Sequence, residues 1–314
     1  RGGQTMSGVD PRLLLRLYAE GRNIMEYLRS AEGGNDETAI LAAYDMQAGS
    51  YAAAMLDPEV YRRNQQVTAK FARLFERLGG ETLLHGGTGE AKTLSHVVEQ
   101  MRRRPRRVHG FDISLSRLLH GRRYALSAGI EDIRFFQGSL LNIPIRDGAF
   151  DIVFTSHSME PNGGRERAIL RELYRVTRRW LVLREPSYEL GNAETRAHIE
   201  RHGYVRGMPE ALSELGYEVV EHELFGEDEN PRNQSALTVI RRHEDTEAAD
   251  WVECGHPYAS PISHDPLIHT GEAYYSETDC LVFPVLSGIP CLLAEQGVFS
   301  SQYLAFANQS EAPV

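Results

Sequence analysis

From residue 82 onward, short apolar runs alternate with segments of helical periodicity, and this alternation limits the fold more than any other feature of the chain. Strands separated by helices build a parallel sheet with helices on both faces, because a parallel crossover needs a long connection. The strand-like runs lie at 82–85, 107–111, 132–136, 150–155, 180–184, 217–224 and 236–241. The sequence therefore predicts an α/β protein with a doubly wound sheet.

The last two of these runs are connected differently from the others. Only the polar segment GEDENPRNQ (226–234) separates them, and it is too short for a crossover helix. We therefore expect them to pair as an antiparallel hairpin after five parallel strands. Plain dinucleotide-binding dehydrogenases do not share this arrangement, and the chain also has no G-x-G-x-x-G motif at the first strand.

Start and stop signals divide the chain into three predicted parts. Residues 1–80 are expected to form an N-terminal helical cap, because Asp10-Pro11 and Asp57-Pro58 are helix starts and Gly79-Gly80 is a stop. Residues 81–243 form the predicted sheet domain. A composition break at HEDTEAAD (243–250) introduces a small α+β domain over 244–314.

Composition limits the classes of partner. A net charge of −10 argues against nucleic acids and anionic membranes, both of which favour a basic surface. No apolar run is long enough to span a bilayer. The three cysteines are expected to be reduced thiols, so we predict a cytoplasmic protein. The acidic charge, together with the predicted N-terminal helices that can enclose a pocket, favours a small-molecule substrate. The arginine run at 102–107 is interpreted as a solvated surface.

A glycine loop follows the first predicted strand. Gly86, Gly87 and Gly89 let a ligand approach the backbone, and the start of the next helix favours negative groups. Asp112 ends the second predicted strand, where a carboxylate can bind the two ribose hydroxyls of an adenosine cofactor. The alternative is that Asp112 only caps the following helix.

These motifs, in this order and spacing, resemble those of the class I S-adenosylmethionine-dependent methyltransferases over about residues 40–243. The resemblance is carried by LLHGGTGE, VHGFDIS, IRFFQGSLLNIPIRDGAFDIVFTSHSMEPN and ELYRVTRRWLVLREPSYE. It implies a Rossmann-like sheet of five parallel strands with an antiparallel terminal hairpin. It also implies S-adenosylmethionine as the cofactor.

The resemblance assigns a set of cofactor-binding residues. They are Tyr44, Tyr51, His85, Gly86, Gly87, Gly89, Asp112, Ile113, Ser139, Leu140 and Ser156. The chain departs from the family in its first motif, where Leu83 and His85 replace an acid and a glycine. His85 either supplies a hydrogen bond or fills space, and we favour the second interpretation. Ser139 replaces the acid that usually receives the adenine amino group, and its uncharged hydroxyl is a weaker acceptor.

Three residues near the ends of the fourth and fifth predicted strands are candidates for catalysis. His157 is the predicted base for a hydroxyl acceptor, and the alternative is a wall residue beneath the adenine. Glu160 either orients an amine or guanidine acceptor or begins a solvated helix. Glu185, together with Tyr188, is expected to face the same crevice.

The C-terminal region, residues 251–300, resembles the small zinc-ribbon-like domain that partners and activates several methyltransferases. Where that domain carries paired cysteines, this chain has Ser260 and Ser263, and serine is a poor zinc ligand. Cys254, Cys280 and Cys291 form no paired set. We therefore predict no metal, and a domain that either packs over the acceptor pocket or forms a homodimer interface.

Together these features predict an S-adenosylmethionine-dependent methyltransferase acting on a small molecule, such as a natural-product, sugar or amino-acid-like acceptor. The alternative is a non-catalytic cofactor-binding or scaffold protein with the same fold. The weakened first motif and the serine at position 139 keep that alternative open.

Overall fold

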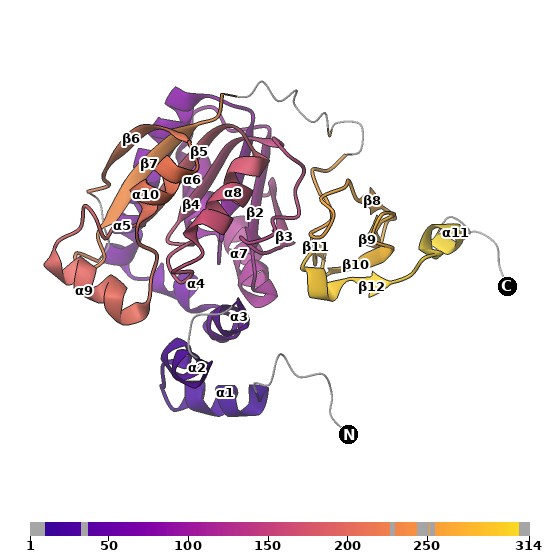
Figure 1. Cartoon of the computed structure of the whole chain (residues 1–314), viewed down its shortest axis with the longest axis horizontal. Helices are drawn as coiled ribbons and strands as arrows, with labels where there is room; N and C mark the ends of the chain where they lie inside the picture. The colour runs from indigo at the N-terminus through magenta and orange to yellow at the C-terminus, as the bar shows by residue number, and fades with distance from the viewer. Residues whose placement is uncertain (1–9, 33–36, 227–229, 244–250, 252–254, 308–314) are drawn as a thin grey trace.

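The computed structural model describes residues 10–32, 37–226, 230–243, 251 and 255–307 (Figure 1). Its central strands are β1 (Thr82–Gly86), β2 (Arg107–Asp112), β3 (Ile133–Gln137), β4 (Phe150–Ser156), β5 (Thr177–Pro186), β6 (Glu218–Leu224) and β7 (Ser235–Arg241). The C-terminal strands are β8 (Ile268–His269), β9 (Ala273–Ser276), β10 (Leu281–Leu286), β11 (Ile289–Pro290) and β12 (Val298–Phe299).

Helices fill most of the remaining described chain. The N-terminal ones are α1 (Pro11–Ala19), α2 (Ile24–Glu32), α3 (Glu37–Met46), α4 (Ser50–Ala54) and α5 (Pro58–Leu78). Those between the strands are α6 (Lys92–Gln100), α7 (Leu115–Ser127), α8 (Glu166–Val176), α9 (Ala193–His202) and α10 (Met208–Glu214). The C-terminal region adds the short 3₁₀ helix η1 (Ala294–Gln296) and α11 (Tyr303–Ala307).

The central sheet has the strand order β3-β2-β1-β4-β5-β7-β6. β1 to β5 pair in parallel, whereas β7 runs antiparallel to both β5 and β6. The predicted α/β class and mostly parallel sheet are confirmed. The order reverses between β1 and β4, so their carboxyl ends open a crevice where α/β sheets bind ligands.

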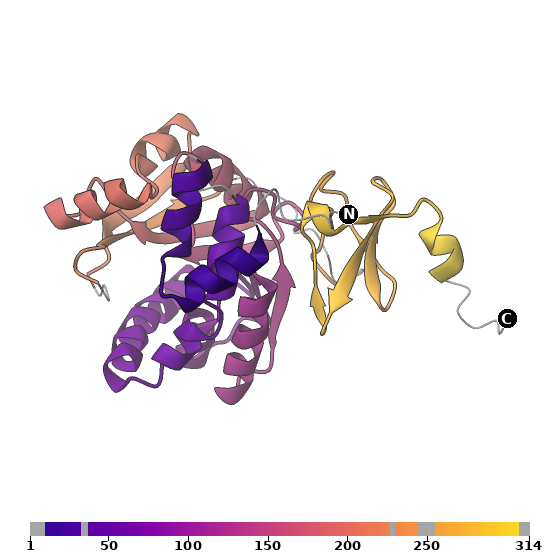
Figure 2. The same cartoon turned by 90° about the horizontal axis from the view of Figure 1, so that it is seen from below.

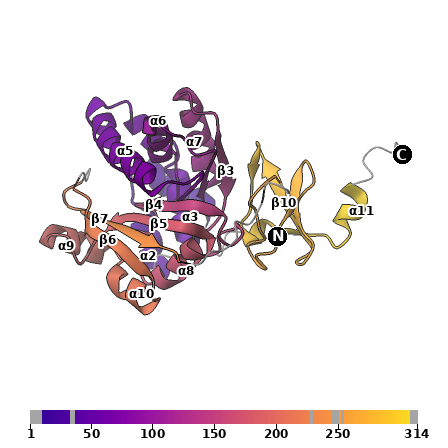
Figure 3. The same ribbon diagram turned by 90° about the horizontal axis from the view of Figure 1, so that it is seen from above.

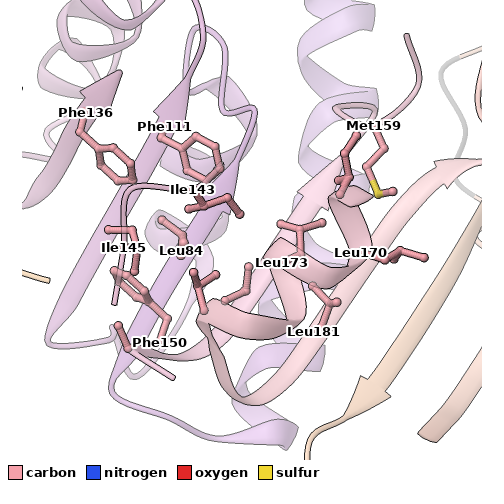
Figure 4. Packing of buried hydrophobic residues seen from close by; sticks show 14 of the residues in the cluster. Leu84, Phe111, Phe136, Ile143, Ile145, Phe150, Met159, Leu170, Leu173 and Leu181 are labelled. Atoms are coloured by element: carbon pink, nitrogen blue, oxygen red, sulfur yellow. The ribbon is translucent and has the colours of Figure 1, made fainter. Parts of the chain in front are cut away.

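Helices cover both faces of the sheet, as the view from above shows (Figure 3). α5, α6 and α7 lie on one face, with α8 and α10 on the other. Figure 4 shows the second layer, in which Leu170 and Leu173 of α8 pack with Leu84, Leu181 and neighbouring apolar side chains. Two continuous apolar layers thus fix the strand ends that carry the site.

The predicted helical N-terminal region is present, but its helices have two different positions. α5 packs its buried face on the sheet, with the rings of Phe71 and Phe75 centred 5.4 and 5.0 Å from that of Phe154 in β4. α1 to α3 form a separate small apolar cluster and lie across the carboxyl edge of the sheet (Figure 2). α5 is therefore part of the sheet's helical layer, whereas the first helices cover the crevice.

The C-terminal strands form a small β-rich unit beside β3, the outer strand of the central sheet (Figure 1). Gln137 of β3 forms a parallel bridge with Cys291. The backbone carbonyl of Gln137 accepts the backbone N–H of Leu292 at 3.0 Å. Ile145 bridges Tyr258 in an antiparallel contact. The C-terminal unit therefore contacts both the end of β3 and the loop that follows it.

Candidate functional site

Two adjoining cavities lie at the carboxyl edge of the central sheet. The larger measures about 390 Å³ and the smaller about 70 Å³. They share the lining residues Tyr44, Gly87, Arg117, His157 and Pro161. The site therefore consists of two compartments that meet between the glycine loop and the end of β4.

The glycine loop between β1 and α6 has the backbone shape that its sequence predicts. Gly87 and Gly89 have φ values of +63° and +55°, in the left-handed region that favours glycine. A Cβ atom on Gly87 would approach the Cβ atom of Ser158 to 2.4 Å. Any side chain there would collide with the turn after β4, so this glycine lets the loop and the turn meet at the shared wall.

Asp112 ends β2 beside the smaller cavity, with only 5% of its surface exposed. Its carboxylate accepts the backbone N–H of Gly89 at 2.8 Å and of Ser114 at 2.9 Å. The N-cap of α7 is Ser114, whose side chain accepts the backbone N–H of Arg117. The alternative interpretation of Asp112 as the helix cap is therefore wrong, and its carboxylate instead orders the glycine loop.

His85 lies at the end of β1 and lines the larger cavity. Its ring stacks on Phe154 with the centroids 4.1 Å apart, and Nδ1 lies 3.0 Å from the Thr88 hydroxyl. Burial lowers the pKa of His85 to about 3, so the imidazole is neutral. The stacking and the single loop contact support the space-filling interpretation.

A carboxylate that the sequence did not indicate lies next to Ser139. Glu37, at the start of α3, lines the smaller cavity together with Ile113 and Leu140. The Ser139 hydroxyl donates to the Glu37 carboxylate, and Ser139 itself is not among the lining residues. An N-terminal helix thus brings a carboxylate next to Ser139, and the distance of Glu37 along the chain leaves no local sequence signal.

His157 lies just after β4, lines both cavities and has a φ of +55°, which is rare for a residue other than glycine. Its Nδ1 is 2.7 Å from Glu160 Oε2, and its Nε2 is 2.7 Å from the Ser235 hydroxyl. Glu160 also accepts a hydrogen bond from Asn233. The structure therefore brings together His157 and Glu160, two of the three predicted catalytic residues. Ser156 lines the larger cavity beside them and accepts from Arg184.

Glu185 does not face either cavity, contrary to the expectation from its position at the end of β5. Its side chain is 3% exposed and accepts backbone N–H groups of Ser158, Met159 and Glu160 at 3.1 to 3.2 Å. Burial raises the pKa of this carboxyl. Glu185 therefore acts as a positioning residue that holds the turn after His157. Tyr188 likewise bonds Glu200 instead of lining a cavity.

The two predicted tyrosines come from different N-terminal helices and meet at the larger cavity. Tyr44 belongs to α3 and Tyr51 to α4. Glu90, the acid that ends the glycine loop, is 1% exposed and accepts backbone N–H groups of Gly49, Tyr51 and Ala52. The glycine loop thereby anchors α4, a contact that the sequence did not reveal.

In the C-terminal unit, three serine hydroxyls converge on one carboxylate. Ser260, Ser263 and Ser276 donate to Asp279 Oδ2 at 2.6, 2.8 and 2.7 Å. The part of the chain that the structure describes contains no cluster of His, Cys, Asp or Glu suited to a metal ion. Cys280 and Cys291 are free thiols, and Cys254 lies outside the described residues.

The C-terminal unit lies outside both cavities. None of residues 255–307 is among the lining residues of either one. The sequence-based alternative that this unit packs over the acceptor pocket is therefore not supported for the described residues. Within the described ranges, no helix combines the length and the apolar character needed to cross a membrane.

Comparison with known proteins gives a match for the middle of the chain. Residues 84–179 match the family model of a methyltransferase domain. The matched segment runs from β1 into β5 and contains the glycine loop, Asp112 and His157. Both cavities therefore take part of their lining from the segment that matches this model. Among curated protein sequences, none matches the chain.

Several solved structures are similar in fold. One is magnesium protoporphyrin IX methyltransferase from Synechocystis PCC 6803, whose structure contains S-adenosylhomocysteine. It is 13% identical to this chain with a TM-score of 0.47, and the match covers 57% of this chain and 84% of that one. Geranyl diphosphate C-methyltransferase from Streptomyces coelicolor A3(2) is 14% identical, with a TM-score of 0.43 and coverage of 55% and 74%. A chain from a complex of the Haloferax volcanii Trm112 methyltransferase activator with a methyltransferase is 18% identical, with a TM-score of 0.47 and coverage of 62% and 96%.

Proposed function

We propose that this chain is an S-adenosylmethionine-dependent methyltransferase with a small-molecule acceptor. The observation that carries the proposal is the buried Asp112 carboxylate, which lies beside the glycine loop and borders the smaller cavity. A buried carboxylate at the end of the second strand suits the two ribose hydroxyls of an adenosine group. The match of residues 84–179 to a methyltransferase domain supports the same cofactor.

The remaining residues of the smaller cavity fit the other parts of an adenosine. Ile113 and Leu140 offer apolar surface to a flat base, and the Glu37 carboxylate offers an acceptor for its amino group. Phe111 supplies an aromatic ring at the base of the same cavity. When bound, the cofactor supplies an electrophilic methyl group on a sulfonium. The residues of this compartment therefore suit an adenosine by charge and by hydrogen-bond acceptors.

The larger cavity is the proposed acceptor site. His157 lies on the wall shared with the smaller cavity, where it can remove a proton from an acceptor hydroxyl. Glu160 fixes one ring nitrogen of His157 and stabilises the charge that a proton would bring. α1 to α3 lie over this crevice, which favours a small acceptor over a macromolecule (Figure 2). The net charge of −10 likewise disfavours a nucleic-acid substrate.

The C-terminal unit has a proposed supporting role. We retain its interpretation, over residues 244–314, as a metal-free relative of the zinc-ribbon-like activator domains. Gln296 donates to the Gln137 side chain, and Gln137 in turn donates to the carbonyl of Ile113 at the smaller cavity. The unit is thus placed to stabilise the adenosine-binding wall. A homodimer through its outer surface stays a separate prediction.

One observation favours the alternative of a non-catalytic cofactor-binding protein. Both ring nitrogens of His157 already have partners in Glu160 and Ser235, so neither is free to take a proton without rearrangement. Incubation with methyl-labelled S-adenosylmethionine and fractionated small-molecule extracts distinguishes the two. Transfer of label to any small molecule supports the enzyme, whereas binding without transfer supports the alternative.

Calorimetry with S-adenosylhomocysteine tests the proposal directly. We expect the wild type to bind, and Asp112→Ala to weaken binding by on the order of 2–3 kcal/mol, since hydrogen bonds to charged groups have this size. Asp132→Ala is the matched control, because that exposed aspartate lies just before β3 and outside both cavities. No binding by the wild type at millimolar ligand would refute the proposed function.

A further inference from the structure

Arg117, in the first turn of α7, lies where the two cavities join. Its guanidinium group covers the glycine loop so closely that a Cβ atom on Gly89 would approach Nη2 to 2.7 Å. The guanidinium carbon lies 4.6 Å from the ring centre of Tyr51 and 5.1 Å from that of Tyr44. Two aromatic faces from the N-terminal helices therefore hold this cation at the junction.

The cation has no anionic partner within the described ranges. No carboxylate of the described residues forms an ion pair or hydrogen bond with Arg117, and its Nε is buried without an acceptor. The nearby acids are occupied: Glu90 accepts amides of α4, and Glu160 bonds His157. Asp112 accepts the amides of Gly89 and Ser114. A partly buried, unpaired guanidinium is costly unless a ligand brings the countercharge.

We infer that Arg117 binds the carboxylate of the cofactor's amino-acid end. This inference rests on the proposed function. The ribose is assigned to Asp112, whose carboxylate accepts the Gly89 amide of the same loop, and the reacting group is assigned to the wall at His157. The amino-acid end must then lie along Gly87 to Gly89, and its carboxylate is the one anionic group of the molecule. A planar guanidinium suits a carboxylate because it donates two parallel hydrogen bonds.

The test compares ligands that differ only in the assigned group. S-adenosylhomocysteine carries the carboxylate, its decarboxylated analogue lacks only that group, and 5′-methylthioadenosine lacks the whole amino-acid end. Calorimetry of the full chain is performed with wild type, Arg117→Ala and Arg117→Lys. Arg123→Ala is the matched control, because Arg123 is an exposed arginine of the same helix that lines neither cavity.

Arg117→Ala should weaken S-adenosylhomocysteine binding about 10- to 100-fold and leave the binding of the two shorter ligands nearly unchanged. Arg117→Lys should show an intermediate loss, since it keeps the charge without the planar fork. Equal losses for all three ligands would show a purely structural role and overturn the inference. Unchanged affinity for all three would also overturn it. Failure of the wild type to bind any of them counts against the proposed function instead.

Discussion

His157 combines three features that rarely coincide in one residue: a left-handed backbone, a place on both cavities and two side-chain partners. Its φ of +55° is stabilised from outside, because Glu185 accepts the next three backbone N–H groups. Strained residues of this kind persist only where the surrounding structure fixes them. This geometry supports a role for His157 in the chemistry.

If His157 is the base, His157→Ala should lower turnover by ~10²–10⁴-fold with nearly unchanged cofactor affinity. Ser235→Ala is the control, because it removes one ring partner and leaves the imidazole in place. Weaker cofactor binding by His157→Ala would instead identify His157 as a wall residue.

Glu37 is the second residue whose role depends on its surroundings. We expect wild type to bind S-adenosylhomocysteine more tightly than the inosine analogue, which lacks the adenine amino group. Glu37→Ala should remove this preference, a loss of about 1.5–3 kcal/mol for the adenine ligand alone, because the charged acceptor is gone. Ser139→Ala should keep most of the preference, since it leaves the carboxylate in place. A preference that survives Glu37→Ala would exclude this role.

At the scale of elements, buried carboxylates that accept backbone amides hold neighbouring segments of the site together. Glu90 ties α4 to the glycine loop, and Glu185 ties the turn after β4 to β5. In the C-terminal unit, which has short strands, the Asp279 carboxylate joins the turn at 260–263 to the end of β9. A single polar group thus connects segments that are separate in the sequence.

Asp279→Ala should lower the melting temperature, because it leaves three serine hydroxyls without their common acceptor. Burial raises the pKa of Asp279, but the hydroxyls of Ser260, Ser276 and Ser263 outweigh it, so the pKa lies below its usual value. The resulting stability is present above the pKa of the unfolded chain and is lost as the pH falls through the folded-state pKa.

The measurement is thermal unfolding of wild type and variant as a function of pH. The difference between them should be largest near neutral pH and shrink in acid. Asp265→Ala is the control, since that exposed carboxylate accepts only one side-chain hydroxyl, from Thr278. A pH-independent difference would contradict the assignment to a charged acceptor.

At the scale of the whole molecule, helices and the C-terminal unit surround the central sheet. Helices cover both faces of the sheet, the first helices cross its carboxyl edge, and the C-terminal unit extends it beside β3 (Figures 1 and 2). Trp251 and Tyr258 belong to the same buried apolar cluster as the strands. The C-terminal unit therefore shares its core with the sheet.

Because a carboxylate and three hydroxyls link the C-terminal turns, purified protein should contain well under one zinc per chain. Chelators should leave its melting temperature unchanged, since no metal contributes to folding. Elemental analysis measures the zinc content, and thermal unfolding with and without chelator measures the change in melting temperature. Stoichiometric zinc, or a lower melting temperature after chelation, would contradict the interpretation of Ser260 and Ser263.

The sequence by itself determined the order and nearly the bounds of the central strands. The spacing of apolar residues and the positions of glycine and proline are local signals, and they are enough to locate a strand. The sequence predicts a strand at 107–111, and β2 lies at Arg107–Asp112. The antiparallel end of the sheet followed from the length of one connection. The glycine loop and Asp112 were identified because their chemistry depends on position relative to a strand end.

Only the tertiary structure decided which side chains meet. β5 begins at Thr177, three residues before its expected start at 180, because pairing of Phe150 with Thr177 beyond a bulge extends it. Glu185 was expected in the crevice, but backbone amides of another segment bind it behind the wall. Glu37 reaches Ser139 from far away in the sequence. Such contacts depend on how separate elements pack, and no local pattern records them.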